Sequence, residues 1–124
     1  MDRLFLRKET PPADTVVVIR GGNMMLESLR KSAEASFRET GLYLISVFLV
    51  EELDLEDVCA RPELRRYRSI RTSVVSKLRA TDFILLATFQ RPHYDIALPN
   101  LADNDLIKLI NCFSPSIRNP AYVQ

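Results

Sequence analysis

The feature that most constrains this fold is a continuous β-branched run near the N-terminus, residues 15–19. The run is too short for a helix, and two prolines lie in the four residues before it. The sequence Arg20-Gly21-Gly22 follows and ends the strand. Because the run is apolar throughout, without alternation, we expect a strand that is central in its sheet or buried on both faces.

The rest of the chain predicts further strands and several helices. Apolar residues at helical spacing predict a helix from Leu26 to Phe37, with Asn23 as its N-cap and Gly41 after its C-terminus. Segments 42–50, 82–89 and 94–98 are predicted strands, and 4–6 is a short edge strand. Further helices are expected over 53–60, 63–79 and from 103 to 113. We therefore expect an α+β fold with a small split-sheet core and three to four helices.

Length and composition bound the class of protein. The chain has 124 residues, which suits a single domain over 1–124 with one core and a loosely held tail from about 114. With 47% hydrophobic and 27% charged residues it is not a disordered chain. It has no apolar run near the ~18 residues that cross a bilayer, and residues 1–9 do not resemble a signal peptide. We expect a cytoplasmic protein without a membrane partner, or one exported by a signal-independent system.

Metal-ligand spacing is absent from the sequence. Cys59 and Cys112 stand far apart, and the chain has one histidine, His93. We expect no metal cofactor and interpret both cysteines as buried thiols in a reducing compartment. A Walker loop, a GxGxxG motif and a nucleophile elbow are also missing.

Charge changes sign abruptly in the middle of the chain. An acidic cluster occupies 51–57, and seven basic residues against one acid follow in 61–79. Such a switch is typical of a protein with an anionic partner on its basic side. The alternative is two oppositely charged faces that pair with each other.

Arg20 is the first candidate for a functional residue. It ends a buried strand directly before Gly21, where the absence of a Cβ allows the backbone to approach a ligand closely. Its guanidinium is suited to clamp a phosphate or carboxylate, with backbone donors from the following helix nearby. Alternatively, Arg20 is an exposed side chain at a strand end and the glycines serve only the turn.

The other candidates are polar residues within or beside apolar strands. Ser46 is either a ligand contact or a satisfied hydroxyl in the sheet. His93 and Tyr94 bring an imidazole and a phenol to the start of a strand, and Asp95 follows them. Glu52 closes the second strand beside Glu51, either as a catalytic carboxylate or as part of a solvated charge run.

Three segments resemble known bacterial enzymes. Residues 16–22 resemble the first-strand Arg-Gly motif of ADP-ribosyltransferases, and 44–48 hold a serine where that family has its Ser-containing second strand. Residues 77–85 are similar to a segment of the ADP-ribosyltransferase-like growth-arrest toxins that are secreted between bacteria. The resemblance covers about half of the chain.

This resemblance implies a split-sheet fold that holds NAD in a cleft, and a toxin or effector that transfers ADP-ribose or hydrolyses NAD. It implies that Arg20, with Gly21 and Tyr94, grips the dinucleotide and that Ser46 helps to place the nicotinamide ribose. The usual glutamate near a late strand has no counterpart here. The remaining candidates for the catalytic group are Asp95, His93 and Glu52, and transfer activity is either carried by such an atypical residue or lost.

Two other functions are compatible with the sequence. A nucleic-acid-binding or RNA-cleaving toxin would use the basic 61–79 helix, with Arg65, Arg66 and Tyr67 on the RNA and His93 as general acid or base. A non-catalytic immunity or antitoxin protein would dock its acidic cluster on a basic enzyme, just as a toxin would have a cognate antitoxin of its own.

Overall fold

The computed structural model describes residues 7–8, 11–21, 24–51, 53–87 and 92–122. Their strands form one seven-stranded antiparallel sheet in the order β1-β5-β6-β3-β2-β4-β7. The strands are β1 (Arg7–Lys8), β2 (Val16–Arg20), β3 (Tyr43–Val50), β4 (Ser69–Val74), β5 (Ile84–Ala87), β6 (His93–Leu98) and β7 (Ile117–Arg118).

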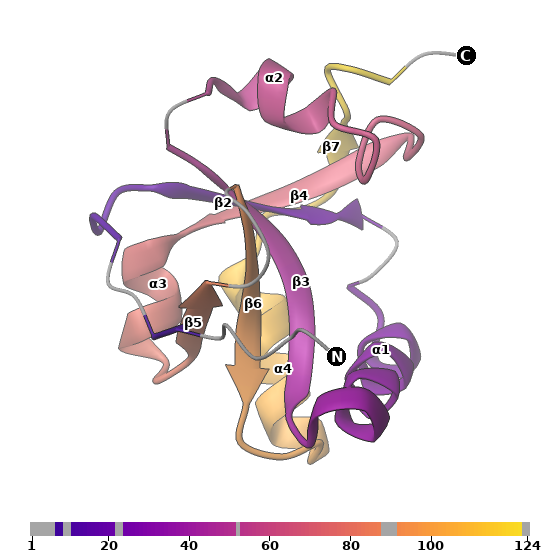
Figure 1. Cartoon of the computed structure of the whole chain (residues 1–124), viewed down its shortest axis with the longest axis vertical. Coiled ribbons are helices and arrows are strands. Elements are labelled where there is room, and N and C mark those ends of the chain that lie inside the picture. The colour runs from indigo at the N-terminus through magenta and orange to yellow at the C-terminus, as the bar shows by residue number, and fades with distance from the viewer. Residues whose placement is uncertain (1–6, 9–10, 22–23, 52, 88–91, 123–124) are drawn as a thin grey trace.

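The α+β class is confirmed, but the sheet is connected and not split in two. Figure 1 shows that β2 and β4 run across the direction of β3 and β6, so the sheet is strongly twisted. The long strand β3 pairs with both β2 and β6 and thereby joins the two differently oriented parts.

In the part of the chain that the structure describes, four helices flank the sheet: α1 (Leu26–Thr40), α2 (Leu55–Cys59), α3 (Val75–Ala80) and α4 (Asp103–Cys112). The main core forms where α1, α3 and α4 pack on one face, which carries side chains such as Val17, Ile45 and Ile96. A second core lies on the other face, where α2 packs against Val18 and Phe48. Within the described ranges, no helix is long and apolar enough to cross a membrane.

The β-branched strand is central, as its sequence predicts. In β2, Val17, Val18 and Ile19 are fully buried, because successive side chains enter the two different cores. Antiparallel partners flank it on both sides, β3 on one and β4 on the other. Continuous apolarity in this segment therefore reflects burial on both faces.

The C-terminus of α1 agrees with the sequence, but its N-terminus does not. Gly41 adopts φ 79° and donates its backbone N–H to the Phe37 carbonyl, as expected of the glycine after a helix. The helix begins at Leu26, and its N-cap is Met25, which makes no side-chain capping hydrogen bond. Asn23, the predicted cap, lies outside the described residues, as does the predicted edge strand 4–6.

The predicted helix over 63–79 is wrong. Residues 62–66 form turns, β4 follows from Ser69 to Val74, and within 63–79 only the part of α3 from Val75 onward is helical. The apolar spacing of this segment matches a helix, but its β-branched residues Ile70, Thr72 and Val74 favour a strand. Strand β4 also satisfies the backbone hydrogen bonds on the open side of β2.

The C-terminal segment is packed, although the sequence predicts a loosely held tail. Strand β7 pairs with the start of β4, and Asn119 is fully buried just after it. The Asn119 side-chain Nδ2 donates to the backbone carbonyls of Leu64 at 3.0 Å and Tyr67 at 2.9 Å. A single asparagine therefore fixes the turn that follows α2.

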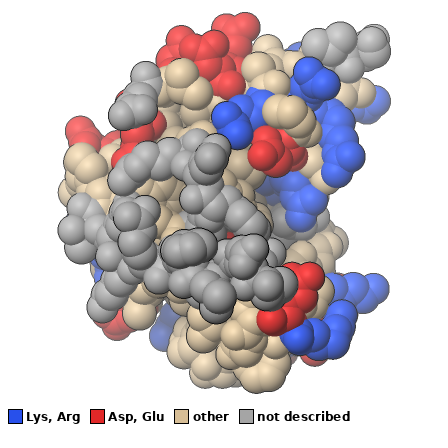
Figure 2. Space-filling model, viewed as in Figure 1, with Lys and Arg blue, Asp and Glu red and all other residues tan. Residues whose placement is uncertain are grey.

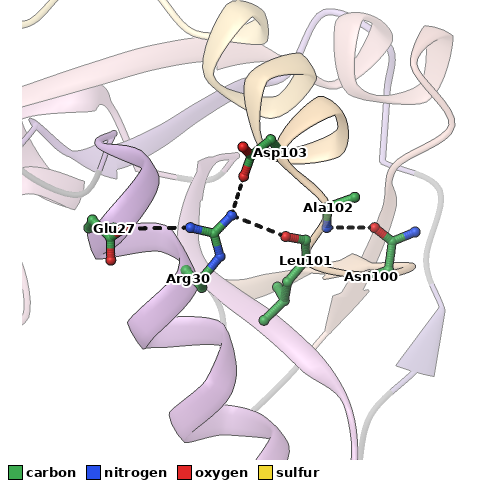
Figure 3. A network of polar contacts seen from close by, with 6 residues as sticks. All are labelled: Glu27, Arg30, Asn100, Leu101, Ala102 and Asp103. Atoms are coloured by element: carbon green, nitrogen blue, oxygen red, sulfur yellow. Dashed lines mark hydrogen bonds and ion pairs between the residues drawn. The ribbon is translucent and has the colours of Figure 1, made fainter.

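Arg30 connects α1 to the start of α4 (Figure 3). Its guanidinium donates a hydrogen bond to the Asp103 carboxylate and another to the Leu101 carbonyl at 3.3 Å, and it lies 3.6 Å from the Glu27 carboxylate. The Asn100 side chain also accepts the Ala102 N–H at 2.8 Å. Polar contacts thus supplement the apolar packing between these two helices.

Both cysteines are free and buried, as predicted. Burial raises the pKa of the Cys59 thiol to about 11, so this thiol is overwhelmingly protonated at neutral pH. A protonated, buried thiol is a poor nucleophile, and Cys59 is therefore a core residue.

Candidate functional site

The candidate site lies on the sheet face opposite α4, where three polar side chains form a row across neighbouring strands. Ser46 of β3 faces Asp95 of β6 directly in the strand register. On the other side, β2 pairs Val18 with Phe48, and Arg20, two residues further along β2, lines two hollows together with Ser46. A cation, a hydroxyl and a carboxylate thus stand side by side.

Ser46 contacts two of the predicted catalytic residues. Its Oγ lies 3.4 Å from the Asp95 Oδ1, to which it donates, and 3.2 Å from the His93 Nε2. His93 lies opposite Phe48 and packs against it edge to face, with ring centroids 5.2 Å apart. The hydroxyl is therefore held between an imidazole and a carboxylate.

Asp95 is unusual because it is a carboxylate only 2% exposed. Its Oδ2 is buried and has no hydrogen-bond partner among the described residues. Burying a carboxylate oxygen without a partner costs free energy, so the position of this atom calls for an explanation such as a role in catalysis. This oxygen retains its capacity to stabilise a positive charge.

Arg20 is held by Tyr67, which belongs to the turn before β4. The Arg20 Nη1 donates to the Tyr67 hydroxyl at 2.7 Å, and its guanidinium lies 5.0 Å from the ring centroid. Arg66 lies 5.3 Å from the same centroid and donates to the same hydroxyl at 3.4 Å. Two cations therefore share one phenol.

The two arginines lower the pKa of Tyr67. Desolvation alone would raise this pKa, but hydrogen bonds from Arg66 and Arg20 and their positive charges outweigh it and favour the tyrosinate. The direction of this shift shows that the surroundings of the hydroxyl favour negative charge.

A hollow of about 230 Å³ lies beside Arg20, and we call it the Arg20 hollow. It is lined by Arg20, Ser46, Phe48, Glu63, Arg66, Tyr67 and His93. A second hollow, of about 280 Å³, lies between α1 and β3 and is lined by Arg20, Ser32, Ala35, Ser36, Glu39, Leu44 and Ser46. Arg20 and Ser46 belong to both, so the two hollows adjoin at this pair.

Three of the residues singled out from the sequence meet in the Arg20 hollow: Arg20, Ser46 and His93. Asp95 joins them through Ser46. Tyr94 does not line it. Tyr94 is fully buried in the main core and donates its hydroxyl to Glu51 at 3.3 Å, because neighbouring residues of a strand point to opposite faces. Glu52 lies outside the described residues.

Gly21 also has a packing role. It is buried, and a Cβ at this position would overlap the Oγ of Ser69 and lie 3.1 Å from the Ser69 carbonyl carbon. A side chain at this position would therefore force Ser69 to shift, whether or not a ligand also approaches. This contact fixes the backbone that carries Arg20.

Glu63 is a site residue that the sequence does not indicate. It lines the Arg20 hollow and pairs with Arg61 at 3.5 Å. The sequence indicates Tyr67 and Arg66 only as parts of a basic helix, and it does not link them to Arg20. If 69–74 is predicted as a strand that pairs with β2, the turn 61–67 is expected beside the end of β2.

Comparisons of the chain with protein-family models, with curated proteins and with solved structures found no match. The function must therefore be inferred from the site.

Proposed function

We propose that the chain is an ADP-ribosyltransferase-like domain, a bacterial toxin or effector that binds NAD at Arg20 and cleaves its glycosidic bond. One observation carries the proposal. Arg20 and Ser46, the two positions at which the sequence resembles that family, line the same two hollows, and Ser46 pairs in the sheet with a buried carboxylate, Asp95. The sequence lacks the usual glutamate. In the proposed reaction, Asp95 supplies the carboxylate that this glutamate would otherwise provide.

The two adjoining hollows support the binding of a ligand whose two halves are joined by an anionic group. Each hollow alone is smaller than a typical small-molecule pocket of ~300–1,000 Å³. A dinucleotide extends over two such spaces, with its pyrophosphate where they adjoin. Arg20 lies at that point, and Arg66 adds a second cation that a diphosphate needs.

The reaction follows from the charges around Ser46. The bond between the nicotinamide nitrogen and the ribose carbon breaks, and its electron pair leaves with nicotinamide. Positive charge develops on the ribose, and the Asp95 carboxylate stabilises it. A hydroxyl or amino group of the target, or water, then attacks the same carbon. His93 accepts the proton that this nucleophile loses, and Ser46 positions the ribose.

The test is nicotinamide release. Purified protein is incubated with labelled NAD and bacterial lysate, beside the Arg20→Ala variant. We expect release of nicotinamide and labelling of a lysate component with the wild-type chain and neither with Arg20→Ala. Absence of nicotinamide release from the wild-type chain would reject the proposal.

RNA cleavage is a second candidate, favoured by the 3.2 Å contact between His93 Nε2 and Ser46 Oγ beside Arg66. A histidine near phosphate-binding arginines can act as general acid or base on an RNA 2′-hydroxyl. RNA that is cleaved without NAD by the wild-type chain but not by His93→Ala would favour this function over NAD cleavage.

A further inference from the structure

A second tyrosine is flanked by two arginines close to the Arg20 hollow. Arg68 and Arg118 each lie 5.9 Å from the ring centroid of Tyr122. Arg20 and Arg66 likewise lie near the Tyr67 ring, at 5.0 and 5.3 Å, and they also donate to its hydroxyl. Neither Arg68 nor Arg118 lines the hollow, and both are exposed.

The backbone holds the two groups next to each other. In the pairing of β4 with β7, Ser69 faces Arg118. The Asn119 N–H donates to the Arg68 carbonyl at 3.0 Å, and the Tyr122 N–H donates to the Asn119 carbonyl at 3.1 Å. Because the Asn119 side chain also binds the Tyr67 carbonyl, one buried residue fixes both tyrosine segments.

Four guanidinium groups thus form two pairs on adjacent segments. Two cations near one ring repel each other, and an anion bound between them relieves this repulsion. Guanidinium groups match phosphate oxygens in geometry, so each pair is suited to bind a phosphate. Figure 2 shows Lys and Arg gathered on the side of the molecule where, in Figure 1, the right-hand end of β4 lies, while Asp and Glu gather over α2.

We propose that these two groups, Arg20–Tyr67–Arg66 and Arg68–Tyr122–Arg118, form a binding surface for single-stranded nucleic acid that leads to the Arg20 hollow. Tyrosine rings and arginine planes stack on unpaired bases, whereas a duplex would offer only its phosphates. An acidic peptide would use the charges but not the stacking surfaces. The binding surface is independent of the proposed NAD chemistry, although it would bring a nucleic acid acceptor to that site.

Fluorescence anisotropy with short labelled oligonucleotides tests this inference. We expect single-stranded RNA or DNA to bind more tightly than a duplex of the same length or polyglutamate, with affinity that falls steeply as salt rises. The double variant R68Q/R118Q should lose at least about tenfold in affinity, and its salt slope should fall by about 2. The matched control K31Q/K108Q removes two exposed charges from α1 and α4 and should bind like the wild-type chain.

The outcomes separate this surface from the proposed function. The inference would be overturned if the chain did not bind oligonucleotides or if it preferred a duplex or polyglutamate. It would also be overturned if R68Q/R118Q and the control lost equal affinity for the oligonucleotide. NAD binding by R68Q/R118Q should equal that of the wild-type chain, because neither residue lines the hollow. A chain that binds oligonucleotides but releases no nicotinamide would retain the surface and reject only the NAD proposal.

Discussion

Ser46 lies directly opposite Asp95 in the sheet, and its hydroxyl donates a hydrogen bond of 3.4 Å to a carboxylate that is 2% exposed. The pair is part of a row that Arg20 begins. Antiparallel pairing thus brings together a cation, a hydroxyl and a carboxylate that are distant in the sequence. Each of the following predictions depends on one contact of this arrangement or of the scaffold that holds it.

Replacing Asp95 by asparagine should separate binding from chemistry. The substitution keeps the shape of the side chain and its contact with Ser46 but removes the negative charge. We expect NAD binding to persist and nicotinamide release to fall about a hundredfold or more, as when other electrostatic stabilisers of a transition state are removed. The control is Asp82→Asn, an exposed aspartate in the turn before β5. Equal activity of the two variants would show that Asp95 has no part in the reaction.

Tyr67 should ionise below the ordinary tyrosine pKa of 10.0. Hydrogen bonds and positive charge from Arg66 and Arg20 stabilise the tyrosinate, so its absorbance should appear at lower pH than that of a free tyrosine. Ultraviolet titration of the wild-type chain should show this early transition. It should disappear in Tyr67→Phe and move to higher pH in Arg66→Gln. An unchanged titration in Arg66→Gln would contradict the assigned contact.

Gly21→Ala should destabilise the fold through a clash with Ser69. The added Cβ would overlap the Ser69 Oγ, and overpacking of this kind costs about 1–3 kcal/mol of unfolding free energy. Adding Ser69→Ala should recover part of the loss, which chemical denaturation would measure. Gly41→Ala is the control, because its cost arises from φ 79° and not from a contact. If Ser69→Ala rescues both glycine variants equally, the clash is not the cause.

Arg30→Gln should weaken the attachment of α1 to α4. It removes the charged hydrogen bonds to Asp103 and Leu101, and because the partners are partly exposed we expect a loss of about 1 kcal/mol in unfolding free energy. The neighbouring variant Lys31→Gln, at an exposed position, should change stability little. Similar stabilities of the two variants would mean that the network in Figure 3 contributes nothing measurable.

Local patterns were sufficient to predict much of the scaffold. Continuous β-branched apolarity identified β2 as a buried central strand, and Gly41 marked the end of α1. The apolar spacing of segment 61–79 fits a helix, whereas its actual structure depends on pairing with β2, whose residues lie 50 to 58 positions away in the chain.

The site was predictable only as separate residues. The sequence indicates Arg20, Ser46 and His93 as candidates because each is a polar residue within an apolar strand or at one of its ends. Their proximity depends on strand order and register, which the sequence does not encode locally. The ligand contact predicted for Tyr94 is not found in the hollow, because adjacent residues of a strand point to opposite faces of the sheet and the Tyr94 hydroxyl donates to Glu51. Glu63 lies in a turn whose position depends on the buried Asn119.

The most direct test of the central claim is a calorimetric titration of the folded chain with NAD. We expect one NAD to bind per chain and Arg20→Gln to weaken binding at least about tenfold, because a guanidinium–phosphate contact is lost. Lys31→Gln should bind NAD like the wild-type chain. No binding by the wild-type chain, or equal affinity of Arg20→Gln and the wild-type chain, would contradict an NAD site at Arg20.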